Sequence, residues 1–310
     1  MRLLMVGAGG IGGYFGARYA LGGHDVTFLA RGATLVALRE RGLTIESAAG
    51  PARLSVKATD RIEDIEEAGE PDAIVLCTKL SDLDAAARQV APLARAALVV
   101  TTQNGVEAHD IAARHIERRV IAPGVAHINV AIKAPGVIVH TGTLAKLRVG
   151  TLMDGPPLEQ VEALVAAGRQ SRIDIERVDD IERTLWEKFV FLAALSGTAC
   201  LARQRVGVIR EDPELRATLR DAMKEICAVA RSRGIGLPPD FVDRQLVFVD
   251  ALPPQACPSL LHDLTEGRPL EAPWLSGAVV RIAAESGVQV PVVRTLYAAL
   301  KPYLDGVPRH

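Results

Sequence analysis

The chain has 310 residues, 49% of them hydrophobic, so it is long enough to bury a large core and to form two domains. Its 36 lysines and arginines nearly balance its 37 aspartates and glutamates, and no basic tract predicts nucleic-acid binding. Residues 189–195 are apolar but far too few to span a membrane, so we expect no membrane segment. Because Met1 leads directly into the first predicted strand, we expect no signal peptide and a cytoplasmic location.

The cysteines form no recognisable ligand or disulfide pattern. They contain no C-x-x-C pair and accompany no histidine cluster at the spacing of metal ligands: Cys77, Cys200, Cys227 and Cys257. We therefore expect buried thiols in a reducing compartment, with no metal site and no disulfide framework.

The N-terminal residues predict a dinucleotide site. A short apolar strand at residues 2–6 runs into Gly7-Ala8-Gly9-Gly10-Ile11-Gly12, and a helical stretch follows through Ala20. In this G-x-G-x-x-G pattern Gly7 permits a tight turn, Gly9 lets the backbone approach a pyrophosphate, and Gly12 lets the helix pack closely on the strand. Free N–H groups and the positive end of the helix dipole would bind the phosphates. The alternative is a glycine turn without a ligand, but the strand–turn–helix context favours a dinucleotide.

The end of the second strand indicates which dinucleotide. This strand is expected at residues 26–29 and ends on Ala30-Arg31-Gly32. A site that prefers NAD carries a carboxylate there, which binds the ribose 2′-hydroxyl and would repel a 2′-phosphate. The guanidinium of Arg31 can instead hold a phosphate bidentately, so we predict NADP(H). A solvated surface arginine is the alternative.

The first half of the chain alternates β-rich and helical stretches, which predicts an α/β fold with a Rossmann-type doubly wound sheet. Strands are expected at residues 3–6, 26–29, 54–58, 73–77, 97–101 and 120–122, with a helix at 82–94. From Val125 the pattern changes to consecutive strand-like segments at 125–132, 137–140 and 146–149, with turns at 135–136 and 141–143. These predict an antiparallel extension of the sheet. A helix at 158–169 and a strand at 173–178 complete an NADP-binding domain of residues 1–178.

The second half predicts an all-α domain, residues 179–310, because strand signals disappear and helical periodicity takes over. Helices are expected at residues 183–202, 214–233, 239–250, 272–286 and 292–303. Asp212-Pro213 is a start signal for the second of them, with Asp as the cap and Pro at the first position. We expect a substrate to meet the nicotinamide in a cleft between the two domains. The Leu-, Ala- and Val-rich helices could equally form a core or a homodimer interface.

Two lysines are candidates for the chemistry. Hydride transfer to a carbonyl leaves an alkoxide that needs a proton donor. Lys79 follows the strand at residues 73–77, at the carboxyl end of the sheet where open α/β folds bind ligands. Lys188 lies among large apolar residues, and a lowered pKa there would suit a general acid. Alternatively, Lys188 reaches solvent or pairs with Glu187 or another nearby acid.

Gln103-Asn104-Gly105 follows the next strand in the same way. An Asn-Gly pair is most often only a turn. At this edge of the sheet, however, Asn104 could hydrogen-bond the nicotinamide or the substrate, so it joins the candidate residues.

In their order and spacing these motifs resemble the ketopantoate reductase (2-dehydropantoate 2-reductase) family over essentially the whole chain. The matching pieces are the glycine turn, Ala30-Arg31, Thr78-Lys79, Gln103-Asn104-Gly105, residues 185–189, and residues 258–264 leading to Glu271. The resemblance implies NADPH-dependent reduction of ketopantoate to pantoate, a step towards pantothenate and coenzyme A. It also implies a Rossmann domain followed by a helical domain.

The resemblance further implies a role for each matching residue. Lys188 would be the general acid, and Glu271 would orient this lysine or a substrate hydroxyl. Ser259 would bind the substrate carboxylate, Asn104 would lie between substrate and nicotinamide, and Lys79 would lie near the cofactor and the reacting centre.

Two of these residues also have structural interpretations. Ser259 could cap a helix after Pro258, since serine is a preferred cap in any helix. Glu271 could be a solvated charge beside Arg268.

One departure from the family pattern bears on the substrate. The family's usual pattern has asparagines one and two turns beyond the lysine, where they bind substrate, and this sequence has Leu192 and Ser196 there. Ser196 can still bind substrate, but leucine cannot, and a buried hydroxyl that loses its partner costs about 1–3 kcal/mol. A different, more apolar 2-oxo acid is therefore an alternative substrate. A third hypothesis is a non-catalytic NADP-binding sensor, which would need no proton donor.

Overall fold

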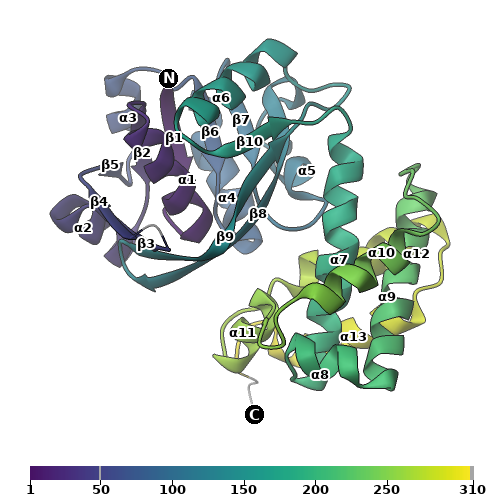
Figure 1. Cartoon of the computed structure of the whole chain (residues 1–310). Helices are drawn as coiled ribbons and strands as arrows, with labels where there is room; N and C mark the ends of the chain where they lie inside the picture. The colour runs from purple at the N-terminus through teal and green to yellow at the C-terminus, as the bar shows by residue number, and fades with distance from the viewer. Residues whose placement is uncertain (49, 308–310) are drawn as a thin grey trace. The chain divides into compact units, whose positions relative to one another are not determined.

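The structure is a computed structural model that describes residues 1–48 and 50–307, and the chain divides into two compact units (Figure 1). Unit 1 contains Met1–Asn104 and Ala108–Ile181, and unit 2 contains Gly105–Glu107 and the chain from Glu182 onward. The boundary predicted at residue 178 lies close to Ile181. The excursion of residues 105–107 into unit 2 had no signal in the sequence.

A parallel sheet forms the centre of unit 1. Its neighbouring strands are, in order, β5 (Lys57–Thr59), β2 (Asp25–Leu29), β1 (Arg2–Val6), β6 (Ala73–Leu76), β7 (Leu98–Thr101) and the start of β8 (Ile121–Ala134). Strands β6 and β7 are buried along their whole length, as expected for parallel strands that are covered on both faces. The predicted doubly wound sheet is therefore confirmed.

The antiparallel extension is also confirmed, although its strands differ from those predicted. Strand β8 turns back into β9 (Val137–Val149), which pairs with it antiparallel. The turn expected at 141–143 is wrong, because β9 continues through these residues. Gly142 lies within this strand and has a φ of +80°. The extension also includes β3 (Leu43–Ser47), β4 (Gly50–Leu54) and β10 (Asp174–Arg177).

The strand predicted at 54–58 is wrong as a single element, because it joins the end of β4 to the start of β5. Strand β3 was not predicted. It pairs with β9, which is far away in the sequence, so short-range patterns carry no signal for it.

Helices accompany this sheet within unit 1. They are α1 (Gly10–Leu21), α2 (Gly32–Arg41), α3 (Ile62–Ala68), α4 (Leu80–Val90), α5 (Ala108–Ala112) and α6 (Leu158–Gln170). Phe15 and Tyr19 of α1 are fully buried in a core with Phe28 and Leu164. The Tyr19 hydroxyl donates a hydrogen bond to the carbonyl of Leu164, which links α1 to α6.

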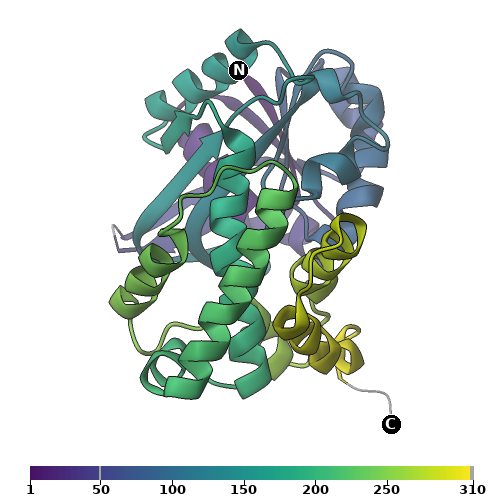
Figure 2. The ribbon, with the colours of Figure 1, turned by 90° about the vertical axis from the view of Figure 1, so that its right-hand side faces the viewer.

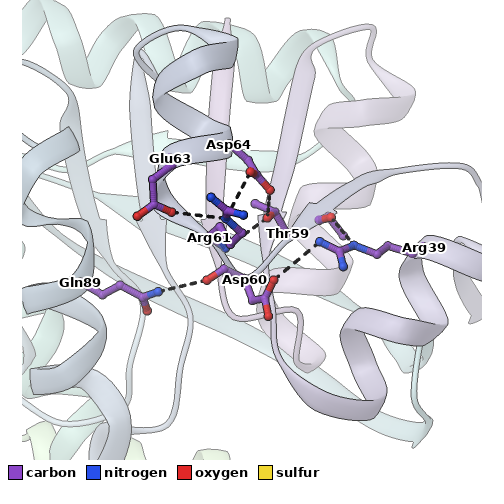
Figure 3. A network of polar contacts seen from close by, with 8 residues as sticks. Arg39, Thr59, Asp60, Arg61, Glu63, Asp64 and Gln89 are labelled. Atoms are coloured by element: carbon purple, nitrogen blue, oxygen red, sulfur yellow. Dashed lines mark hydrogen bonds and ion pairs between the residues drawn. The ribbon is translucent and has the colours of Figure 1, made fainter.

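A polar network surrounds the carboxyl end of β5 at one edge of the sheet (Figure 3). The Thr59 hydroxyl donates to Asp64 at 2.6 Å, and Arg61 pairs with the same carboxylate at 3.6 Å. Arg39 pairs with Asp60 at 3.6 Å. The Thr59 carbonyl accepts a hydrogen bond from the N–H of Ala30, so this network supports the segment that precedes Arg31.

In the part that the structure describes, unit 2 contains helices, turns and loops but no strand, which confirms the predicted all-α region (Figure 2). Its helices are α7 (Ile181–Ala202, whose first residue lies in unit 1), α8 (Val206–Glu211), α9 (Pro213–Ser232), α10 (Phe241–Ala251), α11 (Ser259–Thr265), α12 (Ser276–Ser286) and α13 (Pro291–Leu300). Helix α9 begins as predicted, since the Asp212 carboxylate accepts hydrogen bonds from the N–H groups of Glu214 and Leu215, both at 2.9 Å. The helix predicted at 272–286 is instead a 3-10 turn, Ala272–Trp274, followed by α12.

Helix α7 is longer than the apolar stretch at residues 189–195 that the sequence shows. It has 22 residues and is long and apolar enough, by length and composition alone, to cross a membrane. However, 67% of its 18-residue apolar stretch is buried inside the structure, which is typical of a core helix. We therefore assign α7 to the core of unit 2, and the cytoplasmic location stays a prediction.

Candidate active site

The glycine turn has the backbone geometry that its sequence predicts. Gly7 has a φ of +96°, which L side chains rarely adopt. A Cβ atom on Gly12 would lie 2.0 Å from the carbonyl oxygen of Gly7, so only glycine fits where α1 meets β1. Gly9 differs, because a Cβ atom there would meet nothing closer than Ile132 Cδ1 at 3.9 Å. Packing inside the protein therefore requires glycine at positions 7 and 12 but not at position 9.

Helix α1 starts directly after this turn, with Gly9 as its N-cap and a hydrogen bond from Gly13 N to Gly9 O at 2.7 Å. Among the described residues no side chain caps this end, and its first turn contains no acidic residue. The first N–H groups of a helix have no partner within the helix and carry a partial positive charge. This end of α1 is thus suited to bind an anion such as a phosphate.

Arg31 lies at the N-cap of α2, just beyond the end of β2. Its side chain is 81% exposed, and its Nη2 donates to Asp82 Oδ2 of α4 at 2.9 Å. No sequence pattern marks Asp82 as a partner of Arg31, because only the tertiary fold brings α4 to this arginine. A phosphate bound by Arg31 would have to share the guanidinium with this carboxylate.

Lys79 and Asn104 lie at the same edge of the sheet as the glycine turn. The turn follows β1, Lys79 follows β6, and Asn104 follows β7, and these three strands are parallel neighbours. Lys79 is exposed at the N-cap of α4, and Asn104 is half-buried. The structure therefore brings three of the predicted segments together at the carboxyl ends of the strands, where open α/β sheets bind ligands.

Lys188 lies on α7 in apolar surroundings. Its helix neighbours Leu185, Trp186 and Phe189 are buried, and the two aromatic rings pack edge to face at 5.4 Å. Burial lowers the pKa of Lys188 from 10.5 to about 8, because an apolar environment disfavours the charged form, while the negative charge of Glu271 raises it. Glu187, the acid considered as a partner of Lys188, instead accepts a hydrogen bond from Arg183 at 2.9 Å.

Glu271 precedes the 3-10 turn Ala272–Trp274 and is half-buried. The alternative that it is a solvated charge beside Arg268 is not what the structure has, since Arg268 pairs with Asp263 and Glu266 at 3.6 and 3.7 Å. Arg281 of α12 holds the turn by donating to the Pro273 carbonyl at 2.8 Å. The structure therefore brings the charge of Glu271 within electrostatic reach of Lys188.

The three remaining substrate positions differ in exposure. Ser259 is exposed and is the first residue of α11, whose N-cap is Pro258, so its side chain does not cap the helix. Ser196 is fully buried, and its hydroxyl has no hydrogen-bond partner among the described residues. Leu192, one turn before it on α7, is only partly buried. Leu192 is therefore more exposed than a fully packed core leucine.

Among the described residues, no group of three or more His, Cys, Asp or Glu side chains could hold a metal ion. The expectation of buried thiols holds for Cys200 and Cys227, whereas Cys77 is half-buried and Cys257 is exposed, because it lies in the loop before α11. Burial raises the pKa of the Cys77 thiol to about 12. Such a thiol is protonated at neutral pH and is a poor nucleophile or ligand.

Comparison with known proteins matches both units to the same protein family. A family model described as ketopantoate reductase PanE/ApbA matches residues 3–154, and one described as the C-terminal part of the same family matches residues 180–304. The uncharacterized oxidoreductase YkpB of Bacillus subtilis (strain 168) is 27% identical over 98% of this chain and 99% of that protein.

Solved structures match along the whole length as well. The structure of 2-dehydropantoate 2-reductase from Geobacter metallireducens GS-15 has a TM-score of 0.89 and 30% identity, and covers 97% of this chain and 99% of that one. A ternary structure of D-mandelate dehydrogenase with NADH and anilino(oxo)acetate has a TM-score of 0.88 and covers 98% of each chain. Because its identity is only 19%, this second likeness concerns the fold alone.

Proposed function

The chain belongs to the ketopantoate reductase family, and on that premise we propose that it reduces a 2-oxo acid to the 2-hydroxy acid with NADPH. Ketopantoate, with pantoate as the product, is the substrate that the resemblance favours. The observation that carries the proposal is Lys188, a lysine in apolar surroundings whose pKa is lowered to about 8.

The glycine turn supports the cofactor part of the proposal. Gly9 is a glycine that the packing of the protein does not require, which fits a position where the backbone must approach a pyrophosphate. The N–H groups at the start of α1 would bind the phosphates. When bound, NADPH supplies the hydride through its nicotinamide.

Lys188 has the properties of a general acid. With a pKa of about 8 it is largely protonated at neutral pH, yet it releases its proton more readily than an ordinary lysine. As the carbonyl carbon accepts hydride, Nζ would donate its proton to the carbonyl oxygen. The apolar surroundings favour the neutral amine that remains, and Glu271 favours the charged form before transfer.

The other candidates would orient the substrate. Asn104 and Lys79, at the edge of the sheet, would hydrogen-bond the 2-oxo acid and the nicotinamide. Ser259 would bind the carboxylate, and the buried hydroxyl of Ser196 would bind a polar group of the substrate. Each of these roles rests on the position of the residue within its own unit and on the family resemblance.

Lys188→Met tests the mechanism, because methionine has a similar length but carries no proton. Removal of a general acid typically lowers the rate by about 10²–10⁴-fold. We expect steady NADPH oxidation with ketopantoate in the wild type and this loss of kcat in the variant, with an unchanged circular dichroism spectrum. An unimpaired kcat in the folded variant would overturn the acid role. Tight NADPH binding without turnover of any 2-oxo acid would favour the sensor hypothesis instead.

A second candidate function is the reduction of a more apolar 2-oxo acid. The observation in its favour is Leu192, which lies one turn beyond Lys188 and is only partly buried. A ranking of 2-oxo acids by kcat/KM decides between the two candidates. If ketopantoate leads by orders of magnitude, the second candidate fails; if an aliphatic or aromatic 2-oxo acid leads, Leu192→Asn should shift the ranking towards ketopantoate.

A further inference from the structure

A buried side-chain amide joins the ends of two neighbouring strands in unit 1. Gln103 follows β7, and only 6% of its surface is exposed. Its Oε1 accepts a hydrogen bond from the N–H of Thr102 at 3.1 Å, and its Nε2 donates to the carbonyl of Thr78, beyond the end of β6, at 3.2 Å. Since an N–H can only donate and a carbonyl can only accept, these two partners fix the orientation of the amide.

The two segments that this amide joins carry the candidate binding residues. Thr78 directly precedes Lys79, and Gln103 directly precedes Asn104. Below them the strands are already tied, because the Thr102 hydroxyl donates to the Leu76 carbonyl at 2.9 Å. The Gln103 amide extends this tie past the ends of the strands into the loops themselves.

The glycine turn rests on the same segment. A Cβ atom on Gly7 would lie 3.1 Å from the backbone nitrogen of Thr78 and 3.2 Å from the carbonyl of Cys77, so backbone packs directly against backbone here. The N–H of Cys77 also donates to the Val6 carbonyl at 2.8 Å. A displacement of Thr78 would therefore remove the support beneath the turn as well as moving Lys79.

We propose that Gln103 is a positioning residue that holds Lys79, Asn104 and the glycine turn in the arrangement that binds cofactor and substrate. The inference rests on the proposed function, because the arrangement matters for catalysis only if these segments bind NADPH and a 2-oxo acid. Gln103 itself need not touch either molecule. It acts through the backbone of Thr78 and through its covalent link to Asn104.

Gln103→Met is the test, because methionine keeps the length and approximate volume of glutamine but makes neither hydrogen bond. Misplacement of binding groups by about 1 Å can lower a rate by about 10²-fold. We expect kcat/KM to fall by about 10–100-fold, with both a higher KM for NADPH and a lower kcat.

Thr102→Val is the matched control. It removes the hydrogen bonds of the buried hydroxyl, to the Leu76 carbonyl and to Cys77 Sγ, but leaves both hydrogen bonds of Gln103 in place. We expect it to lower stability about as much as Gln103→Met does, while KM for NADPH and kcat stay within about twofold of the wild type. If the two variants change kcat and KM equally, Gln103 is only a core residue and the proposal is overturned.

Amide hydrogen exchange in the cofactor-free protein separates this proposal from the proposed function. In Gln103→Met the N–H groups of Lys79, Leu80 and Gly105 should exchange faster than in Thr102→Val, compared at equal global stability. Equal exchange rates would overturn the proposal even if the enzyme is active. A wild type that turns over no 2-oxo acid would overturn the proposed function, whereas the exchange experiment would still decide whether Gln103 holds the two loops.

Discussion

The two units fix their candidate residues by different physical means. In unit 1 the lack of space for a side chain requires glycine in the turn, since a Cβ atom on Gly12 would lie 2.0 Å from the Gly7 carbonyl oxygen. In unit 2 the candidate acid is determined by environment, since burial and the charge of Glu271 set the pKa of Lys188. Close packing between backbones leaves a motif in the sequence. The apolar neighbours of Lys188 also appear in the sequence, but the charge of Glu271 that acts on its pKa does not.

The comparison implies that the glycine turn responds to changes of volume and Lys188 to changes of charge. The first two predictions test that difference, and the next two test the charged residues Arg31 and Glu271.

Gly12→Ala is expected to have the largest effect, because backbone atoms cannot move aside as a flexible side chain can. We expect a loss of about 3 kcal/mol or more in the free energy of unfolding, measured by urea denaturation. Gly9→Ala is the matched control within the same turn, since its Cβ atom would meet nothing closer than 3.9 Å. It should lose about 1 kcal/mol or less and yet bind NADPH more weakly. Equal stability of the two variants would contradict the role of volume.

Lys188→Met tests the role of charge through stability. Since the folded pKa of Lys188 is about 8 and its ordinary value is 10.5, the unfolded chain binds more protons between these pH values. The stability of the wild type therefore gains a contribution as pH rises through that window, whereas below pH 8 the partly buried charge is destabilising by at most about 3 kcal/mol. We expect the variant to be more stable than the wild type at pH 7, with a difference that shrinks towards pH 10.5. A difference that widens with pH would contradict the lowered pKa.

Arg31→Ala should change binding and leave stability nearly constant. The Arg31–Asp82 pair is exposed, and such pairs contribute about 0–1 kcal/mol to stability. If Arg31 holds the 2′-phosphate, Kd for NADPH should rise by about 10–150-fold, since a charge-assisted hydrogen bond contributes about 1.5–3 kcal/mol, while Kd for NADH stays constant. Asp82→Asn should act in the opposite direction, because it frees the guanidinium. Equal losses for both cofactors would argue that Arg31 is only a surface residue.

Glu271→Gln should have the smallest effect, a shift in a pH profile. In the direction of reduction, kcat should fall as pH rises through the pKa of Lys188, because the amine must be protonated to act as an acid. Glu271 raises that pKa, so its replacement by glutamine should move the fall to lower pH, by about one unit or less. A shift to higher pH, or none, would show that Glu271 does not act on Lys188.

The sequence predicted those features that depend on local conformation. The parallel strands of unit 1 appear as short apolar runs, and the start of α9 follows from the capping preference of Asp212 and the fixed φ of Pro213. Strand β3 was missed because its partner β9 comes about ninety residues later. The turn expected near Gly142 is instead an irregular part of β9, since pairing with β8 resumes on both sides of it, at His140 and Ala145. The local conformational preference of a segment is overridden where a distant strand supplies its hydrogen bonds.

The same division holds for the candidate site. The sequence by itself determined the glycine turn, Arg31 at the end of β2, and the positions of Lys79, Asn104 and Lys188, because a motif or a local run of residues marks each one. Only the tertiary structure decided what surrounds them: the Asp82 carboxylate beside Arg31, the Gln103 amide against Thr78, and the Glu271 charge acting on Lys188. These contacts join segments that are far apart in the chain. Their strength depends on burial and distance, which a linear pattern does not contain.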